Sequence, residues 1–259
     1  LMVPPVKDIR ILAIDPSFRT GCKLAVLDGT GKFLEQGVIY PNEPRNEVEK
    51  SQEIMAALIN KFNIDVITIG NGTASRETEQ VVANMLLKYT FAKKVTYTIV
   101  SEAGASVYSA SKLAQEEYPE LDVTIRGAIS IGRRLQDPLA ELVKIDPKSI
   151  GVGQYQHDVN QTKLGQELDG VVEDCVNNVG VDLNTASPAL LQYVSGINKT
   201  ISKNLVGFRE KNGKFSNRKE LMSVKMLGEK AFQQCAGFLR ISDGDNPLDK
   251  TAVHPESYE

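Results

Sequence analysis

The sequence predicts a chain of two parts: an α/β domain with a mixed sheet, then an all-α domain made of two similar helical units. Three apolar runs of strand length near the start are followed by alternating helical and strand patterns, which predicts the first part. Two short helical units, each with a glycine at its bend, then follow one another within 183–240, which predicts the second part.

The α/β domain is expected to hold a mixed sheet covered on both faces. The short connections Asp15–Gly21 and Asp28–Gly31 join the first three strands, which should therefore form an antiparallel meander. The expected strands are 9–15, 22–28, 33–40, 66–70 and 95–100. The expected helices are 44–62, 74–89, 104–117, 125–135 and one that starts at Pro138 with Asp137 as its N-cap.

The second part is expected to be helical after a linker over 146–153. A long helix over 158–179, ended by Gly180, should brace the basic region against the first domain. The helices expected beyond it are 189–194, 199–210, 217–224 and 230–239, and the polar residues after Ile241 should be a loosely attached tail. The predicted domains are thus 5–147 and 182–241, with 148–181 as linker and bracing helix and 242–259 as tail.

Composition restricts the classes of function. The three cysteines lie far apart and there are only two histidines, which disfavours structural zinc and a disulfide framework and fits a reducing cytoplasm. No apolar run is long enough to span a membrane, so no membrane partner is expected. The region 183–240 carries ten Lys/Arg and three Asp/Glu, a net charge of +7 in a chain whose net charge is −3. Such a basic block favours an acidic partner, most commonly nucleic-acid phosphate.

The bends of the two helical units are candidate phosphate sites. A glycine at a tight bend exposes successive amide groups at the start of the next helix, and lysines beside it add positive charge. These bends resemble those of a helix-hairpin-helix module, in which a second glycine is usual where Asn198 stands, and the second bend reads Leu-Gly-Glu. Both departures are tolerable at positions prone to the left-handed conformation, but each weakens phosphate capture. The alternative is a pair of hairpins that only pack, with solvated charges. The candidate contacts are Gly196, Asn198, Lys199, Lys203, Gly228 and Lys230.

Three acidic residues end or follow elements of the α/β domain: Asp15, Glu102 and Asp137. Carboxylates at the carboxyl ends of strands can converge, and oxygen ligands without His or Cys suit Mg²⁺ or Mn²⁺. Two such ions could hold the attacking and leaving oxygens of a phosphodiester. Each residue also has an ordinary structural role available, since Asp15 could start a turn, Glu102 could lie at the surface and Asp137 could cap a helix.

The motifs ILAIDPSFRTGCKLAVLD, IGNGTASRETE and SEAGASVYSAS resemble the Tex family of bacterial transcription-accessory proteins, and NTASPALLQYVSGI with NGKFSNRKELMSVKMLG resembles a tandem helix-hairpin-helix module. The resemblance runs from about Pro4 to Tyr258. It implies a YqgF-type domain with the RNase H-like fold of the RuvC resolvases, followed by the helix-hairpin-helix pair. It also implies further domains beyond both ends, so the chain is expected to be a central piece of a longer protein.

The resemblance implies a metal-binding and catalytic role for Asp15, Glu102 and Asp137. Two positions depart from the pattern: Asn71 stands where resolvases carry a further acid, and Ser101 stands where YqgF proteins carry Asp. The site is therefore expected to carry too little negative charge for two metal ions, and nuclease activity is expected to be weak or absent.

Three hypotheses for function follow. The leading one is a module that contacts the backbone of RNA or DNA without sequence specificity, as part of a transcription accessory factor. The second is a metal-dependent nuclease of resolvase type that uses the three carboxylates and Mg²⁺ or Mn²⁺. The third is a scaffold that docks on the transcription machinery.

Overall fold

The computed structural model of the chain describes residues 6, 8–151 and 153–258. They form two compact units. The first unit comprises the described residues up to Glu141 together with residues 149–151. The second unit comprises Leu142–Lys148 and the described residues from Gly153 onward. Within the described ranges, no helix combines the length and apolar character that crossing a membrane would require.

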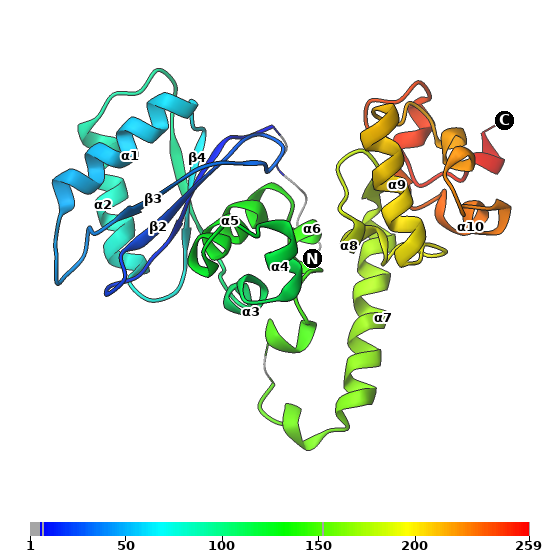
Figure 1. The fold of residues 1–259 in the computed structure, drawn as a ribbon, viewed down its shortest axis with the longest axis horizontal. Helices are drawn as coiled ribbons and strands as arrows, with labels where there is room; N and C mark the ends of the chain where they lie inside the picture. The colour runs from blue at the N-terminus through cyan, green and yellow to red at the C-terminus, as the bar shows by residue number, and fades with distance from the viewer. Residues whose placement is uncertain (1–5, 7, 152, 259) are drawn as a thin grey trace. The chain divides into compact units, whose positions relative to one another are not determined.

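The first unit is built on a five-stranded sheet with the order β3-β2-β1-β4-β5 (Figure 1). The strands β1, β2 and β3 form the predicted antiparallel meander, while β4 and β5 run parallel to β1. The mixed α/β fold of the RNase H-like type is therefore confirmed. The strand bounds are β1 (Ile11–Asp15), β2 (Cys22–Leu27), β3 (Phe33–Ile39), β4 (Val66–Gly70) and β5 (Thr96–Val100).

Helices cover both faces of this sheet, because the central strands carry apolar side chains on both sides. Leu12 and Ile14 of β1 face a core shared with α1 (Val48–Phe62) and α2 (Ser75–Lys88). Ile11 and Ala13 face the opposite way, against α5 (Val123–Gln136). Successive side chains of a strand point to opposite faces of the sheet, so a strand that is covered on both faces buries every residue.

Residues 104–117 form two short helices instead of the single helix predicted. They are α3 (Ala105–Ser109) and α4 (Lys112–Glu117). The break comes at Ser111, whose hydroxyl accepts a hydrogen bond from the amide of Ala114 and so starts a new helix. The prediction of Asp137 as an N-cap is confirmed: Asp137 accepts a hydrogen bond from the amide of Ala140 at 3.0 Å and α6 (Pro138–Leu142) begins at the next residue.

The second unit is helical, with a two-stranded parallel pair in which β6, just after the long helix, lies beside β7, just after the last helix of the hairpins. Its long helix α7 begins at Gln161, three residues later than predicted, because Asn160 caps its first turn. Of its valines, Val172 and Val176 are buried, whereas Val171 is 56% exposed. The bounds are α7 (Gln161–Val179), β6 (Val181–Asp182), α8 (Pro188–Leu191), α9 (Lys199–Asn212), η3 (Arg218–Ser223), α10 (Glu229–Cys235) and β7 (Leu239–Arg240), with short 3₁₀ turns at η1 (Pro147–Ser149), η2 (Gln156–Asp158), η4 (Pro247–Lys250) and η5 (Pro255–Ser257).

The C-terminal residues are firmly held, so the prediction of a loosely attached tail is wrong. Arg218 is 1% exposed and donates hydrogen bonds to the carbonyl oxygens of Thr251 and Val253, at 2.6 and 2.7 Å. Asp249, also buried, lies 3.9 Å from this guanidinium and accepts a hydrogen bond from the hydroxyl of Tyr258. A buried ion pair with satisfied hydrogen bonds therefore ties the polar end of the chain to η3.

Candidate functional site

The two helix-hairpin-helix units repeat with a shift of thirty residues, and their hydrogen bonds repeat with it. Ser187 caps its helix through the amide of Leu190, and Asn217 caps the next one through the amide of Glu220. The first turn (194–198) closes through a bond from the Ile197 amide to the Val194 carbonyl at 3.0 Å. In the second turn (224–228) the Leu227 amide donates to the Val224 carbonyl at 3.1 Å. The two turns thus share one backbone design.

The left-handed residue of each turn is not the one expected. Gly196 has φ +80° and its counterpart thirty residues later is Met226, with φ +67°. Asn198 and Gly228 occupy the next shared position, where φ is −94° and −82° and the backbone is extended. Asn198 therefore does not adopt the left-handed conformation, and Gly228 corresponds to Asn198, not to Gly196.

Asn198 and Gly228 differ in what they leave for a ligand. The side chain of Asn198 accepts hydrogen bonds from the amides of Thr200 and Ile201, both at 2.9 Å. These are amides that a phosphate would otherwise use. Gly228 has no side chain to cap α10. The first turn is thus closed by its own residue, and the second stays open to an anion.

The basic residues of 183–240 divide by type. Arg218 is buried, and Arg209 donates to the carbonyls of Leu183 and Ala186, at 2.8 and 3.1 Å. Arg240 donates to the carbonyl of Gly237. All three arginines are therefore bonded to backbone oxygens inside the unit. The seven lysines are exposed and carry the surface charge: Lys199, Lys203, Lys211, Lys214, Lys219, Lys225 and Lys230.

The first unit brings two of the three predicted carboxylates together. Asp15 ends β1 and Glu102 follows β5 by two residues, at the same edge of the sheet. Burial and the charge of Glu102 raise the pKa of Asp15 from 3.8 to about 6, while the charge of Lys23 lowers it. Two like charges in a partly buried place favour the protonated form of one of them.

The surroundings of Glu102 show why it points to this edge. A Cβ on Gly70 would lie 2.7 Å from Glu102 Oε2, and one on Gly72 would overlap the carboxylate. Asn71 accepts a hydrogen bond from the Glu102 amide at 3.0 Å. Arg134, only 6% exposed, donates to the carbonyls on either side, Ser101 and Ala103. The two glycines and Arg134 were missed from the sequence, although the Gly-Asn-Gly run is visible in it.

Asp137 lies elsewhere, so its predicted convergence with the other two carboxylates is wrong. Helix α5 starts beside Asp15, where a Cβ on Gly127 would lie 3.0 Å from Asp15 Oδ2. It ends at Gln136, whose side chain donates to the carbonyl of Ile9, before the start of β1. Asp137 thus follows the far end of the helix. Among the described residues, no group of three His, Cys, Asp or Glu could hold a metal ion, so they do not fit a two-metal site.

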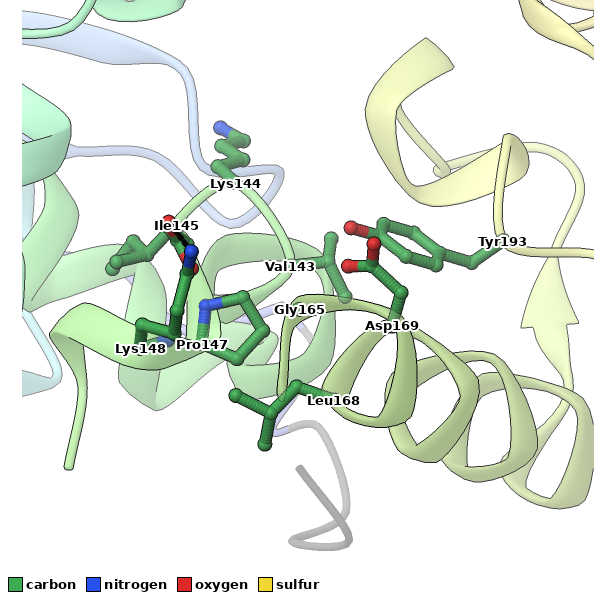
Figure 2. A pocket seen from close by; sticks show the side chains of 10 residues that line it. Val143, Lys144, Ile145, Pro147, Lys148, Gly165, Leu168, Asp169 and Tyr193 are labelled. Atoms are coloured by element: carbon green, nitrogen blue, oxygen red, sulfur yellow. Dashed lines mark hydrogen bonds and ion pairs between the residues drawn. The ribbon is translucent and has the colours of Figure 1, made fainter. Parts of the chain in front are cut away.

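A cavity of about 310 Å³ lies in the second unit beside α7. In Figure 2 the Tyr193 hydroxyl and the Asp169 carboxylate lie near one another on one side of it, and Ile145, Pro147 and Lys148 lie on the other. Burial, Asp169 and Asp146 raise the pKa of the Tyr193 hydroxyl. Two lysines and two aspartates line the cavity together with apolar side chains, so its charge favours neither anions nor cations. The lining is Val143, Lys144, Ile145, Asp146, Pro147, Lys148, Gly165, Leu168, Asp169 and Tyr193.

Comparison with known proteins agrees with this architecture. Residues 9–136 match the Tex protein YqgF-like domain, and residues 176–240 match the helix-hairpin-helix motif. The fold thus defines a YqgF-type protein with an added helix-hairpin-helix domain. Protein tex of Bordetella pertussis is 58% identical over 258 residues, which cover 100% of this chain and 32% of that protein. Transcriptional accessory protein Tex of Neisseria gonorrhoeae is 54% identical over 258 residues, covering 100% of this chain and 33% of that protein.

The chain therefore belongs to the Tex family, and it spans about a third of the length of the curated relatives it matches. Among solved structures, T. thermophilus RuvC in complex with Holliday junction substrate gives a TM-score of 0.35 at 12% identity, over 48% of this chain and 90% of that chain.

Proposed function

We propose that the chain binds the sugar-phosphate backbone of nucleic acid through the open second hairpin turn and the lysines beside both turns, without reading the base sequence. The observation that carries the proposal is the repeated turn geometry, with exposed lysines beside each turn: Lys199 and Lys203 at the first, Lys225 and Lys230 at the second. Turn amides and ammonium groups both donate to phosphate oxygens, and neither distinguishes one base pair from another.

Removing a lysine at each turn should weaken binding and its dependence on salt. For Lys199→Ala with Lys230→Ala, the slope of log affinity against log salt should fall by about one for each phosphate that is no longer neutralised. Fluorescence anisotropy with labelled duplex DNA and RNA of several sequences measures this. Lys163→Ala, an exposed lysine of α7, is the matched control. A wild-type affinity that does not respond to salt, or an equal decrease in the control, would contradict the proposal.

Exchanging the residues at the shared position tests the second turn. Gly228→Asn should cap α10 as Asn198 caps α9, because a Cβ at Gly228 meets nothing within 4 Å. Asparagine in place of an N-cap glycine stabilises by a few tenths of a kcal/mol. The same side chain would occupy the amides that bind phosphate, so affinity should fall while the melting temperature holds or rises.

The reverse exchange, Asn198→Gly, should raise affinity with a slight loss of stability. A folding defect moves both quantities in the same direction, so opposite movements identify competition for the amides. Equal affinity of Gly228→Asn and wild type would argue against a phosphate at this turn.

A second candidate function belongs to the carboxylate pair. We propose that Asp15 and Glu102 can take one Mg²⁺ or Mn²⁺, whose charge would offset the burial and the repulsion by Glu102 that together raise the pKa of Asp15. Two carboxylates with water suit Mg²⁺. The described residues do not supply the ligands of the second ion that two-metal hydrolysis requires.

Docking on the transcription machinery stays a prediction. It is supported by the family alone, through the name of the Neisseria gonorrhoeae relative. Capture of polymerase that survives nuclease treatment would favour it, whereas loss on treatment would indicate a bridge of nucleic acid.

A further inference from the structure

The two turns reach the same conformation by different means. In the first, the left-handed residue is Gly196, for which this conformation carries no steric penalty, and its missing side chain lets the turn approach α10. A Cβ there would lie 2.7 Å from the Cβ of Gln234. In the second, the left-handed residue is Met226, whose Cβ disfavours that conformation. Something outside Met226 must offset this cost.

Packing of the Met226 side chain does not offset the cost of its left-handed conformation, since Met226 is 63% exposed. The bond that closes the turn, from the Leu227 amide to the Val224 carbonyl, has its equivalent in the first turn and so does not distinguish them. The distinguishing contact comes from the other hairpin. The side-chain amide of Asn204, on α9, donates a hydrogen bond of 2.7 Å to the carbonyl of Lys225.

That carbonyl belongs to the peptide group that joins Lys225 to Met226. Its orientation sets the backbone angle entering Met226, so a donor fixed on α9 holds the peptide in the orientation that the left-handed residue requires. The position thirty residues after Asn204 is Gln234, which lies against Gly196. Each turn is therefore braced by the helix of the other hairpin, but only the second turn, with a methionine, needs a bond.

We propose that Asn204 is a positioning residue that holds the second turn in its binding conformation and thereby couples the two hairpins. The proposal deepens the nucleic-acid site and rests on that proposed function for its effect on affinity. Its effect on the turn itself does not depend on any ligand.

The test is a double-mutant cycle between Asn204 and Met226. Asn204→Ala should lower affinity for duplex DNA about fivefold, the worth of one hydrogen bond. Met226→Gly alone should change affinity by less than about twofold, because glycine adopts the left-handed conformation freely. In the double variant most of the affinity that Asn204→Ala removes should return. Gln234→Ala, the matched control at the same place in the repeat, should bind as wild type does.

Amide hydrogen exchange provides a readout without ligand. In Asn204→Ala the Leu227 amide should exchange faster, while the Ile197 amide, its equivalent in the first turn, keeps its rate. If exchange responds this way but no variant changes nucleic-acid affinity, the positioning role stands and the proposed function fails. If Leu227 exchange is unchanged, or if Asn204→Ala lowers affinity and Met226→Gly restores none of the loss, the positioning role is overturned.

Discussion

Replacing Arg218 by alanine is expected to destabilise the second unit by about 3–5 kcal/mol, because it leaves the buried carboxylate of Asp249 without its cation. Both side chains are no more than 2% exposed and lie 3.9 Å apart. The guanidinium also bonds the carbonyl of Leu239 at 2.8 Å and the hydroxyl of Tyr258 at 2.5 Å. Alanine removes these donors together, so residues 242–258 should detach.

Denaturant unfolding and limited proteolysis measure the two consequences. The neighbouring Lys219→Ala, at an exposed position, should unfold within about 0.5 kcal/mol of wild type. Tyr258→Phe, which removes one hydroxyl from the same network, should cost about 1 kcal/mol. If Arg218→Ala unfolds like Lys219→Ala and its C-terminus resists protease, the tail is held by other contacts.

Replacing Asp15 by asparagine is expected to stabilise the first unit at neutral pH. The pKa of the Asp15 carboxyl rises from 3.8 to about 6 on folding, chiefly through burial and then through Glu102. The folded chain therefore holds a proton more tightly than the unfolded chain, and stability is lost as the pH rises from about 4 to 6. At pH 7 the ionised group costs about 1–3 kcal/mol, after allowance for its partial exposure.

The gain in the free energy of unfolding from Asp15→Asn should reach about 1–3 kcal/mol above pH 6. It should vanish near pH 4, where the Asp15 side chain of the folded wild type is as neutral as the asparagine that replaces it. Thermal unfolding across pH measures it, with Glu120→Gln at an exposed position as control. Lower stability of Asp15→Asn at pH 7 would show that the carboxylate stabilises the fold. Added Mn²⁺ tests the cation proposal: it should stabilise wild type and leave Asp15→Asn unchanged.

Much of the fold was predictable because its signals are local. The apolar runs with short turns between them predicted the meander, and β-branched runs predicted β4 and β5. The hairpins were predicted because each of the two helical units has a glycine at its bend. The same local reasoning missed the break before Ser111, where one hydroxyl competes with helix continuation.

The candidate sites were predictable only in part, because they depend on which end of an element faces which. Asp15 and Glu102 were expected together since parallel strands present their carboxyl ends at one edge. Asp137 was misplaced because its pattern shows a helix end but not the direction in which α5 crosses the sheet. Arg218 counted only as one of the ten basic residues of 183–240, since nothing nearby in sequence signals a buried partner 31 residues on.

The sequence by itself determined the two-part architecture, the family, the basic character of residues 183–240 and the two hairpin bends. Only the tertiary structure decided which charged side chains are exposed and can contact a ligand. It placed the arginines inside and the lysines outside, closed one turn with Asn198 and left the other open at Gly228. The physical reason is that periodicity and capping act over a few residues, whereas burial, ion pairing and the bond from Asn204 to Lys225 join residues that only folding brings together.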